Sequence, residues 1–289
     1  MRFLDAIRNF QENPYSSFIL GYITGNSVSS DGSQFVQYSQ GNIVWVSIQY
    51  RLGAYGFLGP KEFDGCQAVQ NAGLQDQRLA LLWIQNHIGA FGGDPSKVTI
   101  WGGSAGGGSV VNQMIYNGGE ASPPYRAAIA GKLHNSQTPC LEPLPIPYLI
   151  TWIEFPWMQP YHSDAFLESQ YSTLLNESRC GDLACLRGLS QSDLENSTTA
   201  TYYTAYSNGL YAYGDMYFGP SIDGTIIQNL PSVEFSKGHF CKVPFMTNHD
   251  GFEGASTSPA YPSILSLMWS QASCLRTSRQ LPLKNWNKH

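Results

Sequence analysis

Charged residues are scarce in this sequence. They make up 13% of the 289 residues, about half of the roughly 25% that is usual in globular chains. The formal net charge is −5, and binding to a polyanion would require a basic surface instead. We therefore expect no nucleic-acid partner. Aromatic residues, glycine and proline are frequent, a composition typical of loop-rich and often extracellular enzymes.

Long apolar runs are also missing. The longest one, residues 145–157, contains three prolines and Glu154 and falls well short of the roughly 20 residues of a membrane-spanning helix. The N-terminus carries Asp5, Arg8 and Glu12, where a secretion signal has an uninterrupted apolar core. The sequence predicts no membrane span and shows no signal peptide.

The six cysteines include no C-x-x-C pair and none lies at a zinc-like spacing from a histidine, so we expect neither a metal nor another cofactor. Cys180 and Cys185 enclose only a short loop, and this spacing alone leaves a local disulfide and two unpaired thiols equally open. Asn176 and Asn196 each begin an N-x-S/T triplet, the acceptor sequence for glycosylation in secreted proteins.

The order of expected elements indicates an α/β fold. Short apolar runs predict strands at residues 42–48, 98–101, 125–130 and 244–248. Helical spacing begins at Leu74, with Ala80, Ile84 and Ile88 on one face, and Gly92 ends the pattern. Another helix follows the second strand. Strands and helices in alternation predict a mostly parallel sheet with helices on its faces.

The remaining segments have weaker patterns. Residues 50–60 are expected to form a glycine-punctuated loop, and short helices are expected at residues 164–175 and 183–194. Residues 196–217 are rich in Tyr, Ser and Gly. Their aromatic side chains could line a substrate pocket, but packing is the commoner role of such residues.

A G-x-S-x-G motif occupies residues 102–106, after an expected strand and before an expected helix. In this arrangement a strained turn exposes the serine hydroxyl above the sheet, and the first helical amides face a developing oxyanion. The motif therefore predicts a nucleophile at Ser104 and an oxyanion donor at Ala105. A glycine-rich pentapeptide also occurs in ordinary loops, but the flanking strand and helix favour the nucleophile.

The sequence resembles the type-B carboxylesterase/lipase family, the cholinesterase-like branch of the α/β-hydrolases, and looks like a truncated member of fungal type. The resembling runs are GNIVWVSIQYRLGAYGFLG, NAGLQDQRLALLWIQNHIGAFGGDPSKVTIWGGSAGGGSV, YRAAIA, CGDLACLRGLS, FGPSIDGTII and VEFSKGHFCKVPFMTNHDGFEG. The resemblance implies an α/β-hydrolase fold, here incomplete at both ends. It also implies a secreted carboxylic ester hydrolase that forms an acyl-enzyme on its serine and acts on small-molecule or lipid esters.

The resemblance also assigns individual residues. Ser104 falls on the nucleophile, while Ala105 and Gly21 fall on oxyanion-hole donors. Cys180 and Cys185 fall on a small disulfide of the family. The acid that orients the catalytic base falls on Glu253, with Asp250 as the fallback in the segment NHDGFEG.

Three stretches depart from the family pattern: residues 1–20, 131–153 and 259–289. Phe18, Ile19 and Leu20 stand where His-Gly-Gly would precede Gly21, and loss of one oxyanion donor costs on the order of 10²–10³ in rate. We expect residues 1–289 to form a single, partial domain that contains these three atypical segments.

The family's catalytic histidine has no counterpart. It would follow the acid in the chain, and only the terminal His289 lies beyond Glu253. We do not assign the base to any other histidine: His87, His134, His162, His239 or His249. Two alternatives to an active esterase therefore stay open, a catalytically inactive fragment or interaction protein of the same fold, and a product that includes translated non-coding sequence. The substrate and the oligomeric state are not predicted.

Overall fold

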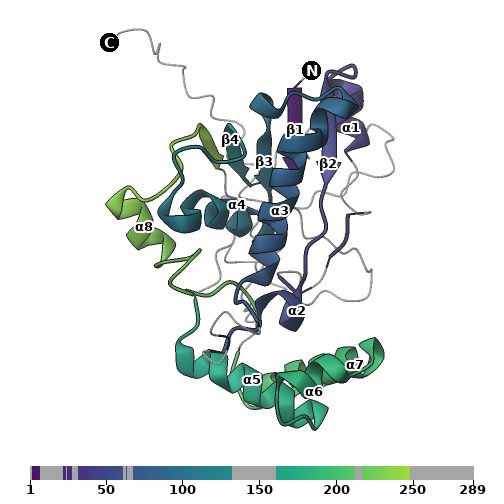
Figure 1. Ribbon diagram of the computed structural model, residues 1–289, viewed down its shortest axis with the longest axis vertical. Coiled ribbons are helices and arrows are strands. Elements are labelled where there is room, and N and C mark those ends of the chain that lie inside the picture. The colour runs from purple at the N-terminus through teal and green to yellow at the C-terminus, as the bar shows by residue number, and fades with distance from the viewer. Residues whose placement is uncertain are drawn as a thin grey trace, which may run out of the picture. The chain divides into compact units, whose positions relative to one another are not determined.

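Figure 1 shows the computed structural model of the protein, which describes residues 2–6, 22–23, 25–27, 32–60, 63, 68–131, 161–211 and 217–247. The chain divides into two compact units. All of the described residues belong to the first unit, Met1–Lys132 with Ile153–Asp250. The second unit, Leu133–Trp152 with Gly251–His289, lies outside them. The expectation of a single domain stays a prediction.

A parallel five-stranded sheet organises the first unit (Figure 1). Its strands are β1 (Arg2–Ala6), β2 (Ile43–Ser47), β3 (Thr99–Gly102), β4 (Ala127–Ala130) and β5 (Phe245–Thr247). They lie in the order β2-β1-β3-β4-β5, and every adjacent pair is parallel. The strand order reverses between β1 and β3, and open sheets of this kind bind ligands beyond the carboxyl ends of the strands at such a point. The α/β prediction is confirmed.

Eight α-helices lie in the described part of the chain. They are α1 (Ser33–Tyr38), α2 (Gly53–Phe57), α3 (Ala72–His87), α4 (Ala105–Ile115), α5 (Asp164–Ser178), α6 (Leu183–Gly188), α7 (Gln191–Ser207) and α8 (Pro231–Lys237). Three short 3₁₀ helices accompany them, η1 (Ile88–Phe91), η2 (Pro95–Lys97) and η3 (Tyr116–Gly118). Helix α4 packs on β3 and β4, and α3 packs against α4.

Strand β3 is buried along its whole length, with Ile100 fully covered and Trp101 2% exposed. A strand that is covered on both faces reads as a continuous apolar run, and this explains why residues 98–101 gave a clear signal. Strand β1 gave none, although it lies between β2 and β3 and pairs Asp5 with Ile100. Its sequence, RFLDA, contains two charged residues, which masked its central position in the sheet.

Helix α3 has the predicted amphipathic pattern. Leu74, Leu81, Ile84 and Ile88 are at most 1% exposed, and they recur at spacings of three, four or seven residues. The predicted helix over this segment is confirmed. Helix α3 ends at His87 and is followed directly by η1, which Gly92 ends at a φ of +78°, a left-handed conformation that glycine adopts without steric cost.

Residues 53–57, predicted as loop, form α2. Two glycines explain why the chain can turn so tightly here. A Cβ at Gly56 would lie 2.1 Å from the Arg51 carbonyl oxygen, and one at Gly73 would lie 2.6 Å from the same atom. The glycines that suggested a loop instead permit close approach between α2 and the start of α3.

The region from residue 161 to 211 is more regular than predicted. Ser163, Asp182 and Ser190 each cap a helix, accepting the backbone N–H of the third residue of α5, α6 and α7 respectively. The expected helix at 183–194 is interrupted at Leu189, and α7 extends to Ser207 through a stretch, rich in Tyr, Ser and Gly, for which no helix was predicted. The capping residues determine where these helices begin, whereas the polar composition of the segment gave no clear indication of how far the helices extend.

Aromatic side chains of this region pack together. Tyr202, Tyr217 and Phe218 form edge-to-face pairs with ring centroids 4.9–6.1 Å apart. Tyr217 and Phe218 are fully buried and belong to one of two apolar cores. The packing interpretation of these residues is the one that the structure supports.

Candidate active site

Ser104 connects β3 to α4. Its backbone has φ +50° and ψ −126°, a region that residues other than glycine rarely adopt. Such a conformation turns the chain sharply from the end of a strand into the first turn of a helix. The side chain is partly exposed, whereas Gly103 and Ala105 on either side are buried. The hydroxyl therefore stands at the carboxyl edge of the sheet, beside the reversal of strand order.

Small residues make this turn possible. Gly102, Gly103, Gly106, Gly107 and Gly108 are all buried, which lets α4 approach β3 and β4 closely. The Gly106 amide donates to the Gly103 carbonyl over 2.8 Å, and the Gly108 amide donates to the Ser104 carbonyl over 3.0 Å. No acidic residue lies in the first turn of α4, so the positive end of its dipole is not neutralised by its own side chains. This end of the helix suits a developing oxyanion.

Buried polar side chains fix α4 in position. The Gln77 amide donates to the Ser109 hydroxyl over 3.0 Å, and the Gln113 amide donates to the Leu74 carbonyl over 2.9 Å. The Tyr125 hydroxyl donates to the Gln113 carbonyl over 3.0 Å. These bonds join α4 to α3 and to the segment before β4. Because a buried group that loses its partner costs about 1–3 kcal/mol, these bonds hold the turn at Ser104 firmly.

Tyr22 contacts both the α2 region and helix α4. Its carbonyl accepts the Gly53 amide over 2.7 Å, and its ring meets Phe57 edge to face at 5.0 Å. Burial raises the pKa of the Tyr22 hydroxyl, and hydrogen bonds with Ser109 and Asn112 partly offset this. Sequence analysis missed these three residues, although the position of Tyr22 directly after Gly21 could have indicated an anchor.

The other residues predicted for the site are not placed. Gly21, Asp250 and Glu253 lie outside the described residues. The structure places Ser104 and Ala105 together at the turn, and β5, which precedes the acidic segment, lies two strands from β3 at the same parallel sheet. The assignments of Gly21 as an oxyanion donor and of Glu253 or Asp250 as the acid therefore stay predictions.

Three histidines are described, and each has a contact of its own. His87 lies 4.9 Å from the Trp83 ring, His162 stacks on Phe166 at 4.0 Å, and His239 lies 3.3 Å from the Glu234 carboxylate. No described residue makes a side-chain hydrogen bond with the Ser104 hydroxyl. His134, His249 and His289 lie outside the described residues. The base that would activate Ser104 is not identified.

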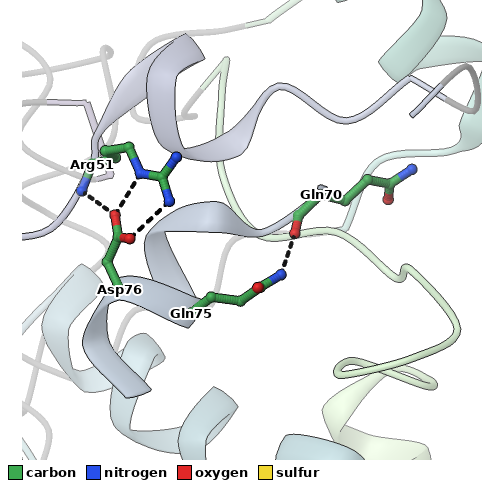
Figure 2. A network of polar contacts seen from close by, with 4 residues as sticks. All are labelled: Arg51, Gln70, Gln75 and Asp76. Atoms are coloured by element: carbon green, nitrogen blue, oxygen red, sulfur yellow. Dashed lines mark hydrogen bonds and ion pairs between the residues drawn. The ribbon is translucent and has the colours of Figure 1, made fainter. Parts of the chain in front are cut away.

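Arg51, which follows β2, is bound to the first turns of α3 (Figure 2). Its guanidinium contacts both carboxylate oxygens of Asp76, at 2.7 and 2.8 Å. The Gln75 amide donates to the Gln70 carbonyl over 3.2 Å in the same region. Partial burial would raise the pKa of Asp76, but the hydrogen bonds from Arg51 outweigh it and lower this pKa below its usual value.

The remaining predicted residues lie far from the Ser104 turn in the sequence. Cys180 and Cys185 form a disulfide between the end of α5 and α6. Asn176 on α5 and Asn196 on α7 are exposed. Within the described ranges, no three His, Cys, Asp or Glu side chains gather as a metal site, and no helix has the length and hydropathy of a membrane span.

Residues 20–129 match the model of the carboxylesterase family. This match includes Ser104, the turn around it and all of α3. Over this segment the chain is similar to the carboxylesterase family. The resemblance seen in the sequence is confirmed.

Known relatives agree with this similarity. The chain is 36% identical to carboxylesterase patB of Aspergillus clavatus over 219 residues, which cover 75% of this chain and 34% of that protein. It is 34% identical to secreted lipase 1 of Botryotinia fuckeliana over 241 residues, which cover 81% of this chain and 38% of that protein. The chain thus spans little more than a third of the length of these relatives.

The solved structure of Aspergillus niger EstA is similar to this chain, with a TM-score of 0.63 and 27% sequence identity. The alignment covers 84% of this chain and 41% of EstA. Together with the parallel sheet and its flanking helices, this similarity shows the α/β-hydrolase fold.

Proposed function

We propose that this chain carries the nucleophile of a carboxylic ester hydrolase, with Ser104 as the attacking residue. The observation that carries the proposal is the strained backbone of Ser104 at the start of α4, within the segment that matches the carboxylesterase family. Small buried neighbours and the unneutralised helix dipole support it.

The reaction proceeds in two steps. Ser104 Oγ attacks the ester carbonyl, and the alcohol leaves with the serine proton. Water then attacks the acyl-enzyme, which releases the carboxylic acid and restores the hydroxyl. The amides of Ala105 and Gly21 stabilise the oxyanion in both steps, and Glu253 orients the base. Substrates of this class are small-molecule or lipid esters, and the chemistry requires no cofactor.

A fluorophosphonate probe tests the nucleophile directly, because it forms a covalent bond only with an activated serine. We expect labelling of the wild-type chain and none of Ser104→Ala. Ser96→Ala is the matched control, since Ser96 is exposed on η2 and bonds only locally to Asp94. Failure of both wild type and Ser104→Ala to react would count against an activated serine in this chain.

The alternative is a catalytically inactive chain of the same fold. One observation favours it: no described residue hydrogen-bonds the Ser104 hydroxyl. Hydrolysis of p-nitrophenyl butyrate separates the two. Turnover that Ser104→Ala abolishes supports the esterase, whereas probe labelling without turnover indicates that the nucleophile is present and the second step is not.

We also propose that the protein is secreted and glycosylated. One of its relatives is named a secreted lipase, a disulfide joins Cys180 to Cys185, and both sequon asparagines are exposed. Expression in a yeast secretion system should give a product whose mass falls on treatment with an N-glycosidase. The variant carrying both Asn176→Gln and Asn196→Gln should show no such fall.

A further inference from the structure

Tyr22 is held at its backbone, its ring and its hydroxyl. Its carbonyl accepts the Gly53 amide at the start of α2, and its ring meets Phe57 edge to face. Its hydroxyl forms hydrogen bonds with Ser109 and Asn112, both on α4. The whole residue is 1% exposed. One buried side chain therefore connects the region of α2 to α4.

A second tyrosine contacts the same part of α4. The Tyr161 hydroxyl donates to the side-chain oxygen of Asn112, which is itself 1% exposed. Burial and, to a smaller extent, the nearby Tyr22 raise the pKa of the Tyr161 hydroxyl. On the other partner, the Ser109 hydroxyl accepts the Gln77 amide over 3.0 Å. Segments far apart in the sequence thus meet in one buried polar cluster on α4.

This cluster lies on the face of α4 that Ala105 begins. Ser109 and Asn112 follow Ala105 at i+4 and i+7, a spacing that places all three on one side of the helix. Ala105 is fully buried and belongs to the same apolar core as Tyr22. Ala105 is a predicted oxyanion donor, and the other, Gly21, precedes Tyr22 directly in the sequence. The contact between Tyr22 and α4 therefore joins the two stretches of chain that are expected to supply these donors.

We propose that Tyr22 is a positioning residue, whose hydroxyl aligns the chain next to Gly21 with the first turn of α4. This inference rests on the proposed function, because it concerns the alignment of that same site. An oxyanion donor is effective only at about 2.7–3.1 Å from the developing charge. Apolar packing alone is not directional, whereas hydrogen bonds to Ser109 and Asn112 require one orientation of the Tyr22 ring. Loss of the hydroxyl should therefore slow the chemical step more than it weakens binding.

Inactivation of the full chain by a fluorophosphonate over a range of probe concentrations tests the proposal. In this reaction Ser104 Oγ bonds to phosphorus, fluoride leaves, and the serine proton passes to the solvent. Tyr22→Phe should lower the limiting rate, kinact, by about tenfold or more and change KI by less than about twofold, because the phosphoryl oxygen takes the place of the oxyanion. A kinact equal to that of wild type would overturn the proposal, and so would a change confined to KI.

Tyr211→Phe is the matched control. It also removes a buried hydroxyl from the core that contains Tyr22, one that donates to the Tyr202 carbonyl over 3.1 Å. Both variants lose one hydrogen bond or more and should lower the urea midpoint, but only Tyr22→Phe should lower kinact. An equal fall of kinact in both variants would show a general loosening of the fold and would overturn the positioning role.

A double-variant cycle tests whether the effect passes through Asn112. Asn112→Leu keeps a side chain of similar size but removes the polar group, and urea unfolding establishes that each variant is folded. Tyr22→Phe/Asn112→Leu should react no more slowly than the slower single variant, because both changes break the same contact. Losses that multiply would overturn this route. If wild type itself does not react, the proposed function fails and this inference with it, whereas a reactive wild type matched by Tyr22→Phe contradicts the inference alone.

Discussion

Arg51 and Asp76 form a bidentate ion pair that joins the segment after β2 to the first turns of α3 (Figure 2). The backbone amide of Arg51 also donates to the same carboxylate, over 3.0 Å. Because Gly56 and Gly73 both approach the Arg51 carbonyl closely, this one residue sets the spacing of two helices.

Replacing Asp76 by Asn should lower the free energy of unfolding by about 1 kcal/mol near neutral pH. The figure is small because half of the Arg51 side chain faces water. The pKa of Asp76 is lowered in the folded state, so its contribution is complete above the unfolded-state value of about 3.9 and disappears as the pH falls through the folded-state value. In urea titrations between pH 7 and pH 3, the difference in unfolding free energy between wild type and Asp76→Asn should narrow toward the acid end.

The control for this experiment is ionic strength. Partly exposed charges are screened by salt. At pH 7, 1 M NaCl should therefore reduce the difference in unfolding free energy between wild type and Asp76→Asn. A difference that stays constant across both pH and salt would mean that Asp76 stabilises the protein through packing and not through its charge.

Leu81 and Leu79 offer a matched pair of deletions on α3. Leu81 is fully buried, whereas Leu79 is 67% exposed. Leu81→Ala should cost about 2–5 kcal/mol, because it removes apolar contacts and leaves a cavity. Leu79→Ala should change the stability by less than about 0.5 kcal/mol. Denaturant midpoints compare the two variants directly, and equal losses would indicate that the outer face of α3 is also covered.

The sequence predicted those parts of the fold in which local pattern and tertiary role agree. Residues 98–101 are apolar because β3 is buried on both faces, and Ile84 and Ile88 recur at helical spacing because α3 covers a core. The G-x-S-x-G motif located Ser104 for a similar reason, since the strained turn itself requires small residues on both sides of the serine.

Prediction failed where tertiary contacts decide the structure. Strand β1 is held by pairing on both sides with β2 and β3, and no local pattern in RFLDA reveals this. Tyr22 is an anchor only because α4 places Ser109 and Asn112 beside it. A cavity among α2, α3 and α5 to α7 arises from packing between segments far apart in the sequence, which spacing arguments cannot reach.

Removing the disulfide should destabilise the chain by about 2 kcal/mol. The estimate follows from the loop that Cys180 and Cys185 close, with a sequence separation of 5, because a crosslink restricts the unfolded chain most when the loop is long. Thermal unfolding of the double variant Cys180→Ala/Cys185→Ala measures the loss. Dithiothreitol should lower the stability of the wild type to the level of the variant and leave the variant itself unchanged, and a further fall in the variant would point to other cysteines.

Replacing Ser104 tests the strain at the proposed nucleophile. At φ +50° and ψ −126° a residue with a Cβ is strained by about 1–3 kcal/mol, whereas glycine adopts positive φ freely and costs about 0.5–1 kcal/mol in chain entropy. Ser104→Gly should therefore be about 1 kcal/mol more stable than Ser104→Ala, although both lack the hydroxyl. Ser109, inside α4, serves as the control position, where Ser109→Ala and Ser109→Gly both lose the same hydrogen bond from Gln77. There the glycine variant should be the less stable by about 1 kcal/mol, because glycine is unfavourable in a helix interior. Urea unfolding of the four variants gives both differences. If alanine proved more stable than glycine at both positions, the turn would not be strained, and the structural argument for Ser104 as an exposed nucleophile would lose its basis.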